Sequence, residues 1–317
     1  MKVAFFTEAE EAWHEHYAGP FPRDFSNMRT EFAWMCALKA DHYNIHSNNI
    51  PKKYDIGIVI IPKNNPAFDI KNIRQYCNKV GVMQEGPNWH WQDYTMRNQI
   101  GYYNTLISAD FILVHNKSDL NYYKGLTNKK KVFSMHSLMI TDDIVPRNEW
   151  GDAVIIGGNM CSWYGGFDSY IVAREFDMPI SAPSMGRKIA REEELENLQH
   201  LDYMIWRKWI DCLSQYHVGV HLMRTHAAGT FALNCAFHGI PCIGYEGLDT
   251  QEILHQHLSV KFGDLDKAKR LAKQLKNDNY FYQMCRKSSQ EMFKKFYSEE
   301  EWLNRWEHIS KMICEEG

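Results

Sequence analysis

Short runs of apolar residues alternate along the chain with longer segments whose apolar residues recur at helical spacing. The short runs are unbroken, which is typical of strands buried on both faces of a parallel sheet. Strands are predicted within residues 2–8, 54–64, 80–86, 110–116, 153–159, 178–187, 201–206, 217–223 and 240–246. Helices are predicted within residues 27–41, 68–79, 117–126, 167–177 and 207–216, and from 264 to the end. The pattern predicts an α/β fold with two Rossmann-like lobes facing across a cleft and helices at the C-terminus.

The periodicity lapses at residues 137–152, where acidic residues, Pro146 and Gly151 interrupt it. We interpret this stretch as a linker, because 317 residues accommodate two lobes of ordinary size. The expected organisation is a first, acceptor-binding lobe at 1–145 and a second, nucleotide-sugar-binding lobe at 151–296. A last helix at 297–317 is expected to pack back on the first lobe.

The amino-acid composition limits the classes of protein to which the chain can belong. With 44% hydrophobic and 24% charged residues the chain is globular, and its net charge of −3 provides no overall basic field for nucleic acid. A local groove of Lys and Arg can still hold phosphates on such a protein. The eight Cys form no C-x-x-C pair, and we expect a reduced, cytoplasmic protein without a leader, in the host cytoplasm if the source is viral. No apolar run approaches about 18 residues, so no membrane span is expected.

Loops that follow strands in the second lobe carry candidate ligand-binding residues, because open α/β sheets bind ligands at the carboxyl ends of their strands. Gly158 and Asn159 lie in such a loop, where glycine lets a phosphate approach backbone N–H groups, although tight turns use the same residues. Arg187 and Lys188 follow the next strand and can hold a diphosphate. A solvated helix start explains this pair equally well.

The stretch "THAAGTFALNCAFHGIPCIG", residues 225–244, predicts a small-residue turn, a helix and a strand. Gly229 and Thr230 begin the helix, whose free N–H groups can bind phosphate. Asn234 lies about one turn further along, and His226 precedes the helix. Taken alone, His226 is a loop residue and Asn234 a satisfied polar residue.

Residues 234–244, "NCAFHGIPCIG", resemble the nucleotide-sugar signature of GT-B glycosyltransferases at Gly239, Pro241 and Ile243. The resemblance covers the whole chain in element order and residues 151–264 in motif. It implies a donor site made by Gly158, Asn159, Arg187, Lys188, His226, Gly229, Thr230 and Asn234. In many members two acidic residues eight apart contact the donor, and here those positions hold His226 and Asn234. An imidazole and an amide would therefore contact the sugar and the ribose in place of carboxylates.

The same resemblance implies that the first lobe binds the acceptor. An inverting transfer needs a general base, for which Glu85 at a strand end is the first candidate, followed by Asp24 and His90. A retaining enzyme would need no such base. No D-x-D motif stands at a strand end, so we expect no essential metal and no cofactor beyond the nucleotide-sugar co-substrate.

The chain also resembles the bacteriophage DNA glycosyltransferases that modify hydroxymethylcytosine. This implies transfer from a UDP-sugar to 5-hydroxymethylcytosine in double-stranded DNA, with Trp89 and Trp91 stacking a flipped base and Arg23 and Arg29 contacting the acceptor. Alternatives are a carbohydrate or lipid-linked acceptor, a nucleotide-sugar epimerase, and a non-enzymatic two-lobed sugar- or nucleotide-binding protein.

Overall fold

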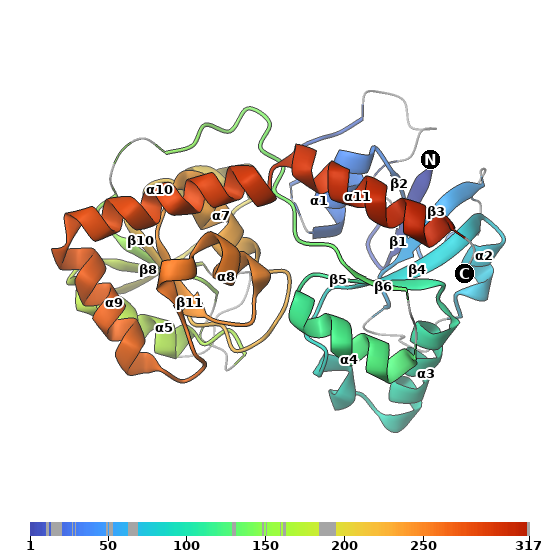
Figure 1. The fold of residues 1–317 in the computed structure, drawn as a ribbon, viewed down its shortest axis with the longest axis horizontal. Coiled ribbons are helices and arrows are strands. Elements are labelled where there is room, and N and C mark those ends of the chain that lie inside the picture. Colours follow the sequence, from blue (N-terminus) through green and yellow to red (C-terminus); the bar gives the residue numbers. More distant parts are fainter. Residues whose placement is uncertain are drawn as a thin grey trace. The chain divides into compact units, whose positions relative to one another are not determined.

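The computed structural model describes residues 1–10, 13, 21–26, 28, 30–48, 50, 53–62, 69–128, 131–147, 149, 151–158, 160, 163–183 and 195–315. The chain forms two compact units. Unit 1 combines Met1–Ile140 with Glu299–Gly317, and unit 2 is the contiguous segment Thr141–Ser298. Each unit is built on its own parallel sheet with helices packed against it (Figure 1).

The six strands of unit 1 are β1 (Val3–Thr7), β2 (Asp41–Asn44), β3 (Tyr54–Val59), β4 (Cys77–Gln84), β5 (Phe111–Val114) and β6 (Val132–Ser134). They are paired in parallel in the order β2-β1-β3-β4-β5-β6. Chain order reverses between β1 and β3, which makes this the topological switch point of the sheet.

Helices cover both faces of the unit 1 sheet. α2 (Lys71–Arg74), α3 (Met96–Ser108) and α4 (Lys117–Thr127) pack on one face, and α1 (Thr30–Leu38) and α11 (Glu299–Cys314) on the other. The ring centroids of Trp34 in α1 and Trp302 in α11 are 5.4 Å apart, and both side chains are fully buried. Trp302 Nε1 also donates to the carbonyl of His136 at 3.0 Å. The last helix of the chain therefore completes the core of the first unit.

The six strands of unit 2 are β7 (Val154–Ile156), β8 (Ile180–Pro183), β9 (Leu198–Leu201), β10 (Val218–His221), β11 (Cys242–Tyr245) and β12 (Ser259–Val260). Their order, β12-β11-β10-β7-β8-β9, is that of the Rossmann fold, and every pair is parallel. The switch point lies between β7 and β10.

The unit 2 sheet is also covered on both faces. α5 (Gly166–Ala173) and α9 (Leu265–Asn277) supply one core cluster, and α6 (Trp206–Leu213) and α7 (Thr230–His238) the other. α10 (Asn279–Phe296) packs against α7, α8 (Asp249–Leu254) and α9. Three short 3-10 turns complete the described elements: η1 (His90–Asp93), η2 (Arg174–Phe176) and η4 (Gln256–Leu258).

Some predicted elements were misplaced. The strand expected within 201–206 lies at Leu198–Leu201, because α6 begins at Trp206. The helix expected over 68–79 is only Lys71–Arg74, since β4 already begins at Cys77. β2, β6, β12, α3 and α8 were not predicted. β2 is a short strand of mixed polarity at the edge of the sheet, and α3 carries apolar residues on two faces.

Candidate functional site

The loop after β7 passes over the switch point of unit 2. Gly157 N–H donates to the carbonyl of Val220 on β10 at 2.9 Å, and Gly158 follows with φ of +96°. A Cβ on Gly158 would come within 3.1 Å of Tyr164 in addition to that unfavourable backbone conformation. Gly158 is therefore required for the turn itself, and the turn places backbone where a ligand of this fold class binds.

The start of α7 faces the same switch point from the strand on the other side. Gly229 is its N-cap with φ of +68°, and a Cβ there would lie 2.1 Å from Thr250 Oγ1. No side chain within the described part of the chain caps the helix, and Thr230, its first residue, is exposed. The leading N–H groups of the helix carry a partial positive charge suited to an anion.

Asn234 lies in the second turn of α7 and is 3% exposed. Its side-chain Oδ1 accepts no hydrogen bond from the described residues. A buried amide oxygen without a donor is costly, by about 1–3 kcal/mol. Its oxygen therefore suits a hydroxyl donor from a ligand.

His226 is half-buried in the loop between β10 and α7 and packs against the turn after β11. A Cβ on Gly247 would lie 1.9 Å from His226 Nε2, so the imidazole rests on that glycine's backbone. Gly247 has φ of +111°, and its N–H donates to Glu252 Oε1 at 2.6 Å. The contact joins the loops that follow two neighbouring strands.

A charged and aromatic cluster that sequence reasoning missed lies at the ends of the same strands. Arg224, after β10, pairs with Asp168 of α5 at 2.6 Å, and the Tyr245 hydroxyl donates to the same carboxylate at 3.5 Å. The guanidinium of Arg224 also stands 5.8 Å from the ring centre of Phe262, after β12. Burial raises the pKa of Tyr245, and Asp168 adds to that effect, so the phenol stays protonated. The available signals were the position of Arg224 just after a predicted strand and that of Asp168 near the start of a predicted helix.

Four predicted site residues lie outside the described residues: Arg29, Asn159, Arg187 and Lys188. Their roles in the donor and acceptor sites stay predictions.

The carboxyl edge of the unit 1 sheet brings Glu85 and His115 together. Glu85 directly follows β4 and is half-buried, while His115 follows the neighbouring β5 and is 4% exposed. Burial lowers the pKa of His115 to about 4, and the nearby charge of Glu85 opposes that shift. The ring is neutral near pH 7, and its Nδ1 donates to the carbonyl of Met135 at 3.2 Å, since a carbonyl only accepts. Nε2 therefore keeps its lone pair and can accept a hydrogen bond.

The aromatic loop after β4 divides into one exposed ring and one packed ring. Trp89 is 38% exposed. Trp91 instead stacks on Tyr102 of α3, with centroids 5.4 Å apart and planes 10° apart. His90 lies between them in η1, with Nδ1 3.4 Å from the Tyr94 hydroxyl. Trp89 thus has the exposure that stacking on a ligand requires, whereas Trp91 contributes to the core.

Arg23 and Asp24 lie in the segment before α1. The guanidinium of Arg23 binds both carboxylate oxygens of Glu299, at 2.7 and 3.0 Å, and the carbonyl of Cys36 at 3.3 Å. These bonds tie the segment to α11, which favours a structural role for Arg23. Asp24 is exposed.

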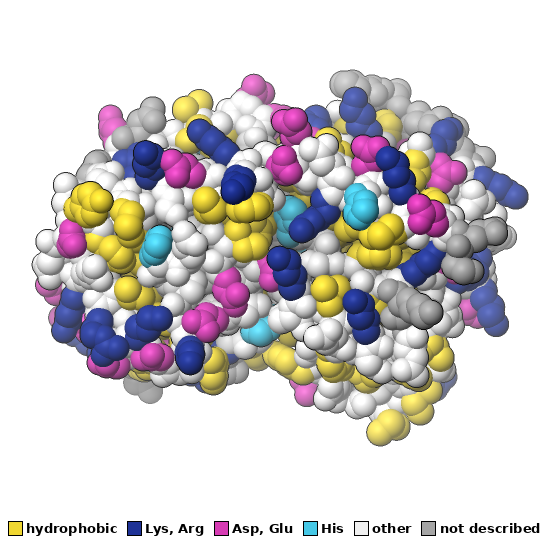
Figure 2. Space-filling view, in the orientation of Figure 1, with side chains coloured by type: hydrophobic (Ala, Val, Ile, Leu, Met, Phe, Trp, Pro, Cys, Tyr) yellow, Lys and Arg dark blue, Asp and Glu magenta, His cyan; other side chains and the backbone are white. Residues whose placement is uncertain are grey.

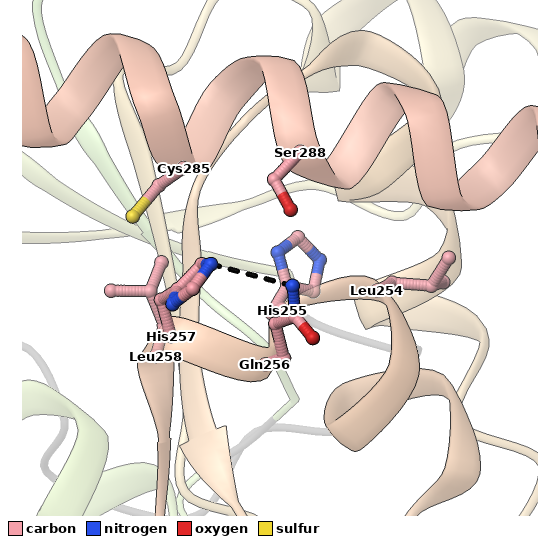
Figure 3. Close-up of a pocket in the computed structure, with 7 residues that line it drawn as sticks. All are labelled: Leu254, His255, Gln256, His257, Leu258, Cys285 and Ser288. Carbon is pink, nitrogen blue, oxygen red and sulfur yellow. Dashed lines mark hydrogen bonds between the residues drawn. The ribbon is translucent and has the colours of Figure 1, made fainter.

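The depression beside η4 of unit 2 does not add a site. Figure 3 shows a depression between η4 and α10, at the amino edge of the sheet because η4 precedes β12. It leaves no room for a water-sized molecule. No three His, Cys, Asp or Glu side chains in the described part of the chain are grouped to hold a metal ion, and none of its helices is long and apolar enough to cross a bilayer.

Comparison with known proteins identifies the fold. Neither a family model nor a curated protein matches the sequence. Solved structures do match: TarM of S. aureus, 10% identical with a TM-score of 0.62, covers 80% of this chain, which spans only 54% of TarM. HepE of Anabaena, in complex with UDP and glucose, is 7% identical with a TM-score of 0.68 over 98% of this chain and 100% of its own.

A third solved structure is an alpha-glucosyltransferase in complex with UDP and a 13-mer DNA containing an HMU base. It is 13% identical with a TM-score of 0.60, over 98% of this chain and 99% of its own. These structures share the GT-B fold, and the two parallel six-stranded sheets with C-terminal helices give this chain the same fold.

Proposed function

We propose that the protein is a glycosyltransferase that moves a sugar from a UDP-sugar to an acceptor hydroxyl. The proposal rests on the start of α7, beside the switch point of a Rossmann sheet. There the leading N–H groups of the helix and the buried Asn234 Oδ1 have no side-chain partner among the residues that the structure describes. An anionic diphosphate and a hydroxyl-bearing ribose are complementary to these two features. The UDP bound to HepE and to the alpha-glucosyltransferase supports this donor class.

In this proposal the donor edge holds and stabilises the leaving diphosphate. The first N–H groups of α7 face its developing charge, together with Arg187 and Lys188. Asn234 Oδ1 accepts a hydrogen bond from a ribose hydroxyl, and His226 contacts the sugar or the β-phosphate. No metal ion is assigned a part, because cationic side chains and the helix start provide the charge.

The acceptor edge is assigned to unit 1. Glu85, which follows a buried strand beside the neutral His115, is proposed as the base that removes the acceptor proton in an inverting reaction. His115 Nε2 can accept a hydrogen bond from a sugar or acceptor hydroxyl. In a retaining reaction Glu85 would instead orient the acceptor.

For the acceptor we propose 5-hydroxymethylcytosine in double-stranded DNA. Two observations support it: the full-length likeness to an alpha-glucosyltransferase with HMU-containing DNA, and the exposed Trp89 in the loop after Glu85, which offers a stacking surface for a flipped base. A carbohydrate acceptor is the second candidate, favoured by the equally complete match to HepE at a TM-score of 0.68.

The test measures UDP release and sugar transfer from a panel of UDP-sugars, with hydroxymethylated DNA, unmodified DNA or oligosaccharides as acceptor. We expect transfer only to hydroxymethylated DNA, at equal rates with and without EDTA. Transfer to oligosaccharides alone would replace the DNA acceptor with the second candidate. Conversion of the donor to another sugar nucleotide, or binding without turnover, would refute the proposed function.

A further inference from the structure

α3 presents a row of large apolar side chains to solvent. Met96, Ile100, Tyr103 and Ile107 are 68%, 53%, 36% and 40% exposed. The opposite face of the helix, with Tyr102, Thr105 and Leu106, is buried in the core of unit 1. The four side chains of the exposed row therefore do not contribute to the core of unit 1.

The surroundings of the row favour a protein partner. Figure 2 shows hydrophobic side chains gathered on the surface over α3. The positions beside the row include Asn104 and Ser108, and Arg97 is the one charged residue among Met96–Ser108. Helices that bind membranes or nucleic acid place several Lys or Arg beside their apolar stripe, and α3 does not.

The spacing of the row makes it complementary to itself. Steps of four, three and four residues reproduce the d-a-d-a seam by which helices pair. In an antiparallel pair around a two-fold axis at the middle of the helix, Met96 faces the partner's Ile107, and Ile100 faces the partner's Tyr103. Every apolar residue of the row then meets another one, as an isologous interface requires.

We infer that this face of α3 is a dimer interface between two copies of this chain. The 13-residue helix is about 20 Å long, so one helix pair gives a contact at the small end of specific interfaces. The dimer is accordingly weak and forms at micromolar or higher concentration. It is independent of the proposed transfer chemistry, because the row does not include Glu85, His115 or any residue of unit 2.

Sedimentation equilibrium between about 1 and 200 μM protein tests the inference. The apparent mass of the wild type should rise from 37.3 kDa towards twice that value. Ile100→Glu should raise the dissociation constant by about tenfold or more, because it places a charge in the seam. Asn121→Glu, at an exposed position of α4, adds the same charge outside the row and should leave association unchanged. Circular dichroism verifies that each variant is folded.

The antiparallel arrangement has its own test. Ile107→Lys should weaken the dimer, and adding Met96→Glu should restore it, since each lysine then faces a glutamate of the partner. A wild type that stays monomeric throughout the range, a dimer indifferent to Ile100→Glu, or a double variant without recovery would overturn the inference. Binding of monomers to phosphatidylglycerol vesicles that Ile100→Glu abolishes would assign the row to a membrane instead, and would equally overturn it.

Discussion

The imidazole of His226 lies on the backbone of Gly247, so that the loops after β10 and β11 support each other. A methyl group at Gly247 would meet His226 Nε2 at 1.9 Å and would also strain a backbone with φ of +111°. We expect Gly247→Ala to lower stability by about 1–3 kcal/mol and donor affinity by about tenfold. Thermal unfolding and titration with UDP measure the two effects.

Gly263→Ala is the matched control for Gly247→Ala. Gly263 also has a positive φ, +81°, but no atom lies within 4 Å of its added Cβ. Gly263→Ala should lower stability through the strained backbone, but it should leave the affinity for UDP unchanged. Equal UDP affinity in the two variants would remove His226 from the donor site.

Asn234→Ala should raise the donor KM by about tenfold, because a hydrogen bond of about 1.4 kcal/mol to the ribose is lost. The wild type should show the same rise in KM with the 2′-deoxy or the 3′-deoxy donor, whichever lacks the hydroxyl that Asn234 binds. With that donor, Asn234→Ala should cause little further rise in KM. Asn104→Ala, on the surface of α3, serves as the control. If the effects of Asn234→Ala and of the missing hydroxyl on KM are additive for both deoxy donors, the ribose does not bind at Asn234.

Glu85→Gln should reduce kcat by about 10²–10⁴-fold while leaving UDP affinity unchanged, because the amide cannot accept the acceptor proton. Asp93→Asn, an exposed residue in the same loop region, should retain wild-type turnover. Steady-state kinetics and UDP titration separate the two quantities. An active Glu85→Gln variant would rule out Glu85 as the base.

Stability should fall as pH drops from 6.5 towards 4. Burial lowers the pKa of His255 to about 4, so between these values the unfolded chain binds a proton that the folded chain does not. The contribution of His255 to the free energy of unfolding is fully present above pH 6.5 and amounts to at most about 3 kcal/mol. Burial has the same effect on the pKa of four other histidines: His115, His217, His221 and His238.

A pair of variants isolates the part played by His255. Its Nε2 donates to the carbonyl of Ala232 at 2.9 Å, and its Nδ1 accepts from Cys242 N–H at 3.4 Å. His255→Gln should destabilise the protein and flatten the dependence of Tm on pH, whereas His257→Gln, at the exposed neighbour shown in Figure 3, should do neither. An unchanged slope for His255→Gln contradicts the prediction.

Arg23→Ala should cost about 1 kcal/mol or less, because the two side chains of its ion pair with Glu299 are 31% and 26% exposed. Glu299→Ala should cost a similar amount, and the double variant less than the sum. Urea unfolding gives these values. If Arg23 is structural, the acceptor KM stays unchanged in all three variants. A raised acceptor KM confined to the Arg23 variants would return Arg23 to the acceptor site.

The strand ends of unit 2 were predictable because unbroken apolar runs and the turn residues after them are local signals. Gly158 and Gly229 stand where the structure needs positive φ. The burial of Asn234 could not be predicted from the sequence, because it depends on α10 and the sheet, which pack against α7. Packing between distant segments likewise gives Arg23 its ion pair with Glu299, which is 276 residues away in the sequence.

His115 shows a different limit of sequence reasoning. The strand 110–116 was predicted, yet the histidine near its end looked no different from His90, which lies in a loop richer in polar residues. Only the parallel pairing of β4 with β5 puts it next to Glu85, and only the returning carbonyl of Met135 fixes its tautomer. Both are tertiary relationships.

The return of α11 to unit 1 has a consequence for biosynthesis. Residues 141–298 are contiguous, so unit 2 has all of its elements as soon as Ser298 has left the ribosome. Residues 1–140 of unit 1 are translated before unit 2, but Trp34 cannot be covered until Trp302 and Ile313 have followed Ser298. The unit whose synthesis begins first is thus the one that can complete its core only after the other. A chain truncated after Ser298 would consist of a folded second unit attached to an incomplete first one.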